Sequence, residues 1–249
     1  MIEEGPKNDY LISMENNLVS KEQIDINDET FEKVMFLYNS ALKEIKTKIE
    51  ILQEELKLFY EYEPIEYITT RIKKPESIIE KLKRKNYNLT YENMFEKIND
   101  IAGIRIVCNF KKDVYKLVEI IENFQDVKIV NKKDFMKNPK KSGYMSYHII
   151  TEVPVNFSAG IMFVRVEIQI RTIGMDFWAS LEHKLKYKNS DISKNDSKNL
   201  MKYAKVINNI DEGMLTIYNK NEKEMQNNIT IEAAGSEKDL NKKKFKFKL

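Results

Sequence analysis

Apolar and polar residues alternate along residues 165–171, whose sequence is RVEIQIR. Every second residue is apolar, and this period of two predicts a β-strand with one face in a core. The opposite face would carry two arginines, a carboxylate and an amide: Arg165, Glu167, Gln169 and Arg171. On this pattern alone a solvated outer face is the commoner interpretation, and a functional face is the alternative.

The same patterns predict the other elements of the chain. Further strands are expected at residues 101–110, 127–130, 147–155 and 161–170, the last two joined as a hairpin by the segment NFSAG. Helical spacing of apolar residues predicts one or two long helices over 28–62 and further helices at 73–86, 91–99, 112–124, 175–188 and 195–228. Residues 131–146 are expected to form a polar loop. The apolar side of the helix at 175–188 is predicted to consist of Phe177, Trp178, Leu181 and Leu185.

These elements indicate an α+β protein with a mixed sheet of about four or five strands, flanked by helices and extended by long N- and C-terminal helices. The 249 residues suit one sizeable domain. We expect a flexible leader at 1–27, a single domain at 28–228 and a disordered basic tail at 229–249.

Composition limits the class of protein. No apolar run is long enough to span a membrane, and the acidic, polar start does not resemble a secretory signal. A single cysteine, Cys108, excludes an internal disulfide framework. We therefore expect a cytoplasmic protein without a membrane partner. The net charge of +3 does not demand a nucleic-acid partner, although the last nine residues hold five lysines. A solvated chain end is the commoner interpretation of such a tail, and a polyanion or oligomer contact is the other.

Two carboxylates are candidates for a metal site. Asp100 stands just before the predicted strand IAGIRIVC, and Glu167 lies on the polar face described above. If the two strands are neighbours, the carboxylates meet on one face, and two acidic groups with substrate phosphates are typical of magnesium. The alternative for Asp100 is a purely structural role, as a capping residue in the loop before the strand.

Cationic and aromatic residues surround this pair in the sequence. Arg105 lies among apolar residues and needs a partner, either Glu167 or Asp100 in an ion pair, or a base or phosphate of a ligand. Residues 70–85 hold seven basic residues around a helix start, where phosphate binds readily, although a solvated basic helix is the simpler interpretation. The segment NPKKSGYMSYH places Tyr144 and His148 near the flexible Gly143.

Several other chemistries are excluded by missing motifs. The sequence contains neither a P-loop nor a Rossmann fingerprint, and it lacks an Asp-x-Asp pair. With only His148 and His183, it cannot build a multi-histidine metal hydrolase site, and one cysteine cannot build a zinc finger. A basic, aromatic, carboxylate-bearing site suited to nucleotides and magnesium remains.

Five motifs in a fixed order resemble the RelA/SpoT-type alarmone synthetases, and most closely the small stand-alone members of the RelQ kind. They are Arg-x-Lys followed by Ser-Ile-x-x-Lys, Asp-Ile-Ala-Gly-Ile-Arg, Lys-x-x-Gly-Tyr-x-Ser-Tyr-His, Glu-Ile-Gln-Ile-Arg-Thr and Trp-Ala-x-x-Glu-His. The resemblance covers residues from about 40 to 220. It implies a fold similar to nucleotidyltransferases and the transfer of pyrophosphate from ATP to the 3′-hydroxyl of GDP or GTP, giving (p)ppGpp and AMP.

The resemblance also implies roles for single residues. Glu167 and Asp100 would be catalytic and would bind Mg²⁺, and Glu167 would help to deprotonate the 3′-hydroxyl. The residues expected to bind ATP are Arg71, Lys73, Ser77, Lys81, Arg84 and Arg105, with Arg71 and Arg105 enclosing the adenine. The residues expected at the guanine nucleotide are Lys140, Tyr144, His148, Gln169 and Arg171, with the Tyr144 ring stacked on the base.

The resemblance implies synthesis without hydrolysis, a homotetramer formed through the terminal helices, and regulation by RNA or alarmone as an option. GMP is a third possible acceptor. The alternative function is a non-catalytic nucleotide- or RNA-binding regulator on the same scaffold. The presence of both Asp100 and Glu167 favours the enzyme.

Overall fold

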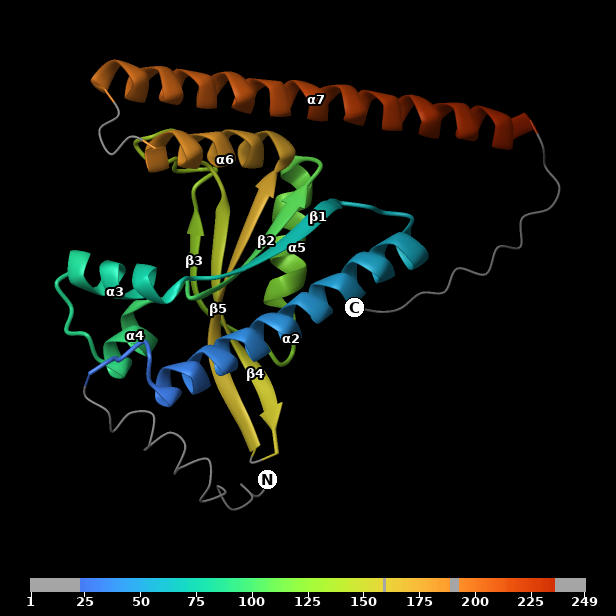
Figure 1. Ribbon diagram of the computed structural model, residues 1–249. Coiled ribbons are helices and arrows are strands. Elements are labelled where there is room, and N and C mark those ends of the chain that lie inside the picture. The colour runs from blue at the N-terminus through green and yellow to red at the C-terminus, as the bar shows by residue number, and fades with distance from the viewer. Residues whose placement is uncertain (1–22, 159, 189–192, 236–249) are drawn as a thin grey trace. The chain divides into compact units, whose positions relative to one another are not determined.

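The computed structural model describes residues 23–158, 160–188 and 193–235. A five-stranded mixed sheet forms its centre, in the strand order β1-β2-β5-β4-β3 (Figure 1). The strands are β1 (Ile65–Ile72), β2 (Ala102–Cys108), β3 (Lys128–Asp134), β4 (Tyr147–Phe157) and β5 (Gly160–Thr172). β2 and β5 pair in parallel, and the other three pairings are antiparallel. This arrangement confirms the predicted α+β class and makes the strands after Asp100 and around Glu167 direct neighbours.

One face of the sheet is buried by two helices, α2 (Glu29–Tyr60) and α5 (Lys111–Glu122). The alternation predicted for β5 is present: Val166, Ile168 and Ile170 are fully buried in the core, together with buried residues of α2 and α5. Figure 1 shows α2 running across the sheet. Because side chains alternate along a strand, the residues between these three point to the opposite face.

Local signals set the bounds of the helices. The Asp28 side chain accepts a hydrogen bond from the Thr30 amide and caps α2, which ends at Glu61 in the left-handed conformation. Pro75 opens α3 (Pro75–Arg84), where its fixed φ and missing N–H cost nothing. Thr90 caps α4 (Tyr91–Lys97) by accepting from the Asn93 amide. Pro75 and Thr90 thus set where α3 and α4 begin.

Two helices follow β5, namely α6 (Ile173–Lys188) and α7 (Lys194–Gly235). Residues up to Asp211 form one compact unit, and residues from Glu212 onward form a second, which contains the rest of α7. Within the first unit, Trp178 and Ala179 of α6 pack with Ala204 of α7 in a small cluster apart from the main core. None of the described helices is long and apolar enough to cross a bilayer.

The structure corrects three predictions from the sequence. The strand β1 was not predicted, and β3 extends through Asp134 into the segment expected to be a loop. On α6, Trp178 is buried as expected, but Phe177, Leu181 and Leu185 are exposed in the single chain. The strands β1 and β3 lie at the edges of the sheet and are mostly exposed. Their sequences therefore show the apolar pattern of a core strand only weakly.

The predicted segment boundaries are only partly covered by the described residues. Ile24 and Ile26, which fall within the expected leader, pack against the core. The α7 helix continues to Gly235, beyond the expected end of the domain at residue 228. Residues 1–22 and 236–249, which contain most of the predicted leader and tail, lie outside the described residues.

Candidate active site

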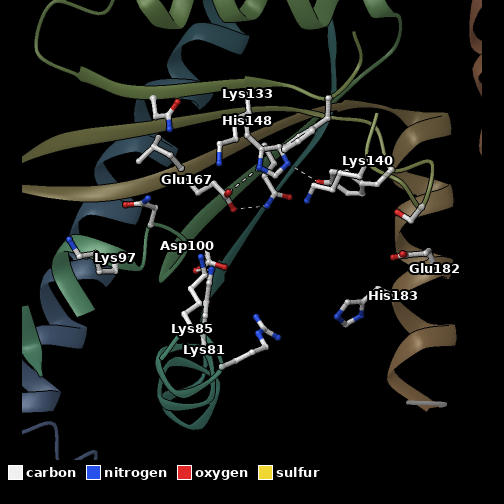
Figure 2. Close-up of a pocket in the computed structure, with 18 residues that line it drawn as sticks. Lys81, Lys85, Lys97, Asp100, Lys133, Lys140, His148, Glu167, Glu182 and His183 are labelled. Carbon is white, nitrogen blue, oxygen red and sulfur yellow. Dashed lines mark hydrogen bonds and ion pairs between the residues drawn. The ribbon is translucent and has the colours of Figure 1, made fainter. Parts of the chain in front are cut away.

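A cavity of about 740 Å³ lies against the polar face of the sheet (Figure 2). Strands β3, β4 and β5 form its floor, while α3, α4 and α6 supply the surrounding walls. Its basic, acidic and histidine lining residues are Lys81, Arg84, Lys85, Lys97, Asp100, Lys133, Lys140, His148, Glu167, Glu182 and His183. Five lysines and one arginine against three carboxylates make this a cavity suited to a polyanion.

The sheet register places polar side chains in two rows across the floor. The first row runs through Lys133, His148, Gln169, Arg105 and Thr69, which are successive partners from β3 to β1. These residues lie far apart in the sequence, and only the pairing of the strands makes them neighbours. The row joins residues expected at the guanine nucleotide to one expected at ATP.

The second row runs through Asn131, Ile150, Glu167, Gly103 and Arg71. Gly103 stands between Glu167 and Arg71 and contributes no side chain. A small hollow of about 40 Å³ is found here, lined by Arg71, Gly103, Arg105, Asp100 and Glu167 among others. The two arginines expected to enclose the adenine therefore border one hollow next to the carboxylates.

Asp100 is held by two lysines at the start of β2. Lys73 Nζ donates to Oδ2 at 3.0 Å, and Lys81 Nζ lies 2.7 Å from Oδ1. The contact between Lys81 Nζ and Oδ1 is an ion pair. Burial alone would raise the pKa of Asp100, but the contacts with Lys81 and Lys73 outweigh it and hold the pKa below its usual range. Asp100 is therefore ionised at neutral pH.

Glu167 accepts a hydrogen bond on each carboxylate oxygen. His148 Nδ1 lies 3.0 Å from Oε1, and Gln169 Nε2 lies 2.7 Å from Oε2. Burial and the nearby charge of Asp100 raise the pKa of Glu167, whereas His148 and Gln169 lower it, and the net effect is a lowered pKa. The sequence-based expectation that the two carboxylates share one face is met, since both line the large cavity and the small hollow.

Tyr144 lies between the aromatic and the charged parts of the site. Its hydroxyl is 2.8 Å from His148 Nε2 and accepts from Arg171 Nη2 at 2.7 Å. Lys140 Nζ lies 4.5 Å from the centre of the Tyr144 ring and 4.6 Å from the centre of the Phe135 ring, which is within cation–π distance of both. Burial lowers the pKa of Lys140. The ring expected to stack on guanine thus has a lysine over its face.

Arg105 has a partner that the sequence did not suggest. Its Nη1 lies 3.1 Å from Asp176 Oδ1, so of the two interpretations left open, the ion pair with Glu167 or Asp100 is wrong, and contact with a base or phosphate stays a prediction. The residue is half-buried on the polar face instead of being enclosed in the apolar core. Burial and the charge of Arg171 lower the pKa of Arg105, and its Nε is buried without a hydrogen-bond partner among the described residues.

Asp176 on α6 is the residue that sequence reasoning undervalued. Its Oδ1 accepts a hydrogen bond from Arg171 Nη1 at 3.0 Å and also forms an ion pair with Arg105. Its Oδ2 accepts a hydrogen bond from the Tyr67 hydroxyl at 2.8 Å. Burial and the bond to Asp176 raise the pKa of Tyr67 to about 12. A carboxylate one turn into a helix gives no sign of burial, so no sequence signal could have identified this anchor.

The basic cluster of residues 70–85 is divided between several positions. Lys81, Arg84 and Lys85 line the large cavity, whereas Lys73 does not line it and donates a hydrogen bond to Asp100. Ser77 is half-buried on α3 and lines neither the cavity nor the hollow. Lys133 on β3 was missed, because its segment was taken for a loop, and it faces the cavity beside His148.

Comparison with known proteins places this fold and site in a class. Residues 70–192 match the model of the region found in RelA/SpoT proteins. The chain is 43% identical over 190 residues to the GTP pyrophosphokinase YwaC of Bacillus subtilis, covering 76% of this chain and 90% of that protein. It is 36% identical over 197 residues to the GTP pyrophosphokinase YjbM of the same organism, covering 77% and 90%.

Solved structures agree with this assignment. The crystal structure of small alarmone synthetase 2 from Bacillus subtilis aligns with a TM-score of 0.70 at 41% identity, covering 77% of this chain and all of that one. Small alarmone synthetase 1 from Bacillus subtilis, bound to its product pppGpp, aligns with a TM-score of 0.72 at 34% identity, covering 78% and 98%. The chain belongs to the RelA/SpoT family, and within it to the small alarmone synthetases.

Proposed function

We propose that this protein is a GTP pyrophosphokinase, which transfers pyrophosphate from ATP to the 3′-hydroxyl of GDP or GTP. The products are AMP and ppGpp or pppGpp, the signals of the stringent response. The observation that carries the proposal is the pair of ionised carboxylates, Asp100 and Glu167, in a cavity whose lining also holds five lysines and one arginine. Family membership supports the same conclusion.

ATP is assigned to the side of the cavity formed by β1, β2 and α3. Arg71 and Arg105 border the small hollow and can enclose the adenine ring by stacking, which planar guanidinium groups do well. Lys81 and Arg84 line the adjoining wall and can neutralise the triphosphate. We also propose Lys73 and Ser77 as phosphate ligands. Lys73 contacts the carboxylate of Asp100, as Lys81 does, which supports this role for Lys73.

Magnesium is the proposed cofactor, with Asp100 and Glu167 as its protein ligands. No cluster of three or more acidic, histidine or cysteine ligands is found in the described residues. Two ionised carboxylates beside a phosphate site nevertheless fit Mg²⁺, which usually takes one or two carboxylates and completes its shell with phosphate oxygens and waters. When bound, the ion would neutralise charge developing on the transferred group. Lys73 and Lys81 would then be released toward phosphate.

The guanine nucleotide is assigned to the side formed by β3, β4 and α6. The Tyr144 ring can stack on the base once Lys140 leaves its face, and Lys140 can then contact the phosphates of the acceptor. His148 and Lys133 share one row of the floor and add positive or polar groups beside it. Gln169 and Arg171 hold Glu167 and Tyr144 in place from the same face.

The reaction requires the 3′-oxygen of the acceptor to attack the β-phosphorus of ATP. The bond between that phosphorus and the oxygen bridging to the α-phosphorus breaks, and AMP leaves with this oxygen. Glu167 receives the proton of the 3′-hydroxyl, and the lysines and arginines stabilise the charge on the transferred group. Most of the rate enhancement is expected from positioning and from charge stabilisation.

We further propose that the enzyme synthesises and does not hydrolyse alarmones, that it works in the cytoplasm and that it forms a homotetramer. Two histidines, one on β4 and one on α6, cannot supply a multi-histidine hydrolase centre. The exposed Phe177, Leu181 and Leu185 on α6 support an oligomeric contact, because large apolar side chains on one helix side favour burial. We also propose regulation by RNA or alarmone, because the lysine-rich C-terminal segment suits a polyanion.

The test is the separation of products after incubation with radiolabelled ATP and Mg²⁺, with GMP, GDP and GTP offered in turn. Label is expected on the guanine nucleotide, and Glu167→Gln is expected to abolish it. Glu122→Gln is the matched control, because Glu122 on α5 pairs with Lys132 outside the cavity. EDTA should stop transfer, and added Mg²⁺ should restore it.

Failure of transfer with every acceptor, from folded protein, would contradict the enzyme. The alternative, a nucleotide- or RNA-binding regulator, would be favoured by salt-sensitive RNA binding that survives Asp100→Asn.

A further inference from the structure

A continuous chain of hydrogen bonds connects the buried Asp176 to Glu167. Arg171 Nη1 binds Asp176 Oδ1 at 3.0 Å, and Arg171 Nη2 donates to the Tyr144 hydroxyl oxygen at 2.7 Å. The Tyr144 hydroxyl contacts His148 Nε2 at 2.8 Å, and His148 Nδ1 contacts Glu167 Oε1 at 3.0 Å. Five side chains, from β4, β5, α6 and the segment before β4, thus form one path through the site.

The identity of the donors along this chain fixes the form of the imidazole. A guanidinium group can only donate, so the Tyr144 oxygen accepts from Arg171 and keeps its own proton available. No further acceptor for that proton lies within hydrogen-bonding distance among the described residues. The hydroxyl therefore donates to His148 Nε2. The proton of the neutral ring is then on Nδ1, where it is donated to Glu167.

This arrangement opposes the intrinsic preference of histidine, whose neutral ring in water favours a proton on Nε2. With Nε2–H, the bare Nδ1 would face a carboxylate oxygen, and two acceptors 3.0 Å apart repel. The side chains of the path are 5–15% exposed at Arg171, Asp176, His148 and Glu167. Little water is therefore available to relieve such a mismatch, which increases its cost.

We propose that the Tyr144 hydroxyl is a positioning group for Glu167, acting through the tautomer of His148, in addition to any stacking of its ring. Arg171 holds the hydroxyl in place, and Asp176 holds Arg171. The proposal rests on the proposed function in taking Glu167 as the carboxylate that faces the 3′-hydroxyl. Two hydrogen bonds connect Tyr144, whose ring is assigned to the guanine, with Glu167, the carboxylate assigned to the 3′-hydroxyl. Binding of the guanine and alignment of Glu167 therefore depend on the same tyrosine side chain.

The first test measures the tautomer directly and needs no activity. The chain has two histidines, so ¹⁵N-labelled histidine gives two sets of ring signals, and His183→Gln identifies those of His148. In mildly alkaline solution, a long-range ¹H–¹⁵N spectrum should show His148 with its proton on Nδ1. In Tyr144→Phe the signal should move toward the Nε2–H form or a mixture.

The matched control is Tyr115→Phe, since the Tyr115 hydroxyl bonds Asp134 and lies outside the cavity lining. This variant should leave the His148 signals unchanged. An Nε2–H signal in the wild type, or an Nδ1–H signal that persists in Tyr144→Phe, would overturn the proposal. Dispersed amide spectra of each variant establish that the chain is folded.

The second test separates positioning from stacking by kinetics. Tyr144→Phe keeps the ring, so KM for the guanine nucleotide should stay within about twofold while kcat falls about tenfold, the effect of one lost hydrogen bond. Tyr144→Leu removes the ring and should raise KM as well. An unchanged kcat in Tyr144→Phe would contradict the positioning role. Absence of activity in the wild type would instead refute the proposed function and leave the tautomer measurement valid.

Discussion

Arg171 and Asp176 form an ion pair of 3.0 Å in which both side chains are at least nine-tenths buried. Removing one partner of such a pair leaves an uncompensated charge that water cannot reach. Asp176 also holds Arg105, so its loss would strand two guanidinium groups. This carboxylate is thus the structural anchor beneath the candidate site.

We expect Asp176→Ala to lower the free energy of unfolding by about 3–5 kcal/mol, the usual cost of breaking a buried ion pair from one side. Urea unfolding of variant and wild type provides the measurement. Asp126→Ala removes the partner of Lys48 in an exposed pair and should cost no more than about 1 kcal/mol. Equal effects of the two substitutions would show that Asp176 is not an anchor.

Gly103→Ala should impair ATP binding without unfolding the protein. A Cβ here would lie 3.8 Å from the backbone oxygens of Arg71 and Glu167, which is ordinary van der Waals distance, so the fold can accept it. The methyl group would, however, occupy the hollow between Arg71, Arg105 and Glu167. We expect KM for ATP to rise about tenfold, in line with the cost of one excess methyl group in a packed site.

Gly213→Ala is the control for this experiment, because a Cβ there meets no atom within 4 Å. It should leave KM for ATP unchanged. If Gly103→Ala lowered the free energy of unfolding by as much as it weakened ATP binding, the glycine would serve the fold and would not keep space for a ligand.

Lys133→Ala should weaken binding of the acceptor in proportion to its number of phosphates. Lys133 faces the cavity, whereas the adjacent Lys132 points away and binds Glu122 at 2.8 Å. We expect KM to rise most for GTP, less for GDP and least for GMP, with a total effect of about tenfold for GTP from one charge-assisted contact. Lys132→Ala, the neighbour on the other face, should change none of the three values.

Stability should fall in acid through Asp100. Its pKa in the folded protein is below the ordinary value of about 3.9, so the unfolded chain binds more protons and stability rises with pH. The contribution is therefore complete above about pH 4 and is lost as pH falls through the folded pKa. Urea midpoints measured from neutral pH into this acid range should drop less steeply in Asp100→Asn than in the wild type. Parallel curves would refute the role of Lys73 and Lys81 in stabilising the charge.

The identification from sequence depended on residues that stand close together along the chain. The segment from Arg165 to Arg171 has a period of two, and this period alone determines that Glu167 and Gln169 share a face opposite Ile168. The order of five motifs was enough to indicate the family, as the comparisons with known proteins bear out. Long amphipathic helices such as α2 could also be predicted from the sequence, because each carries a complete apolar stripe.

Tertiary structure decided which side chains meet. The row from Lys133 through His148 and Gln169 to Arg105 exists only because four strands pair in one register, and nothing in a single strand specifies its neighbour. The edge strands β1 and β3 are mostly exposed, so the sequence pattern did not reveal β1 and revealed only the start of β3. The partner of Arg105 proved to be Asp176 from α6, since a charge finds its counter-ion across space and not along the chain. Sequence thus determined the faces of the elements, whereas packing determined the contacts between those faces.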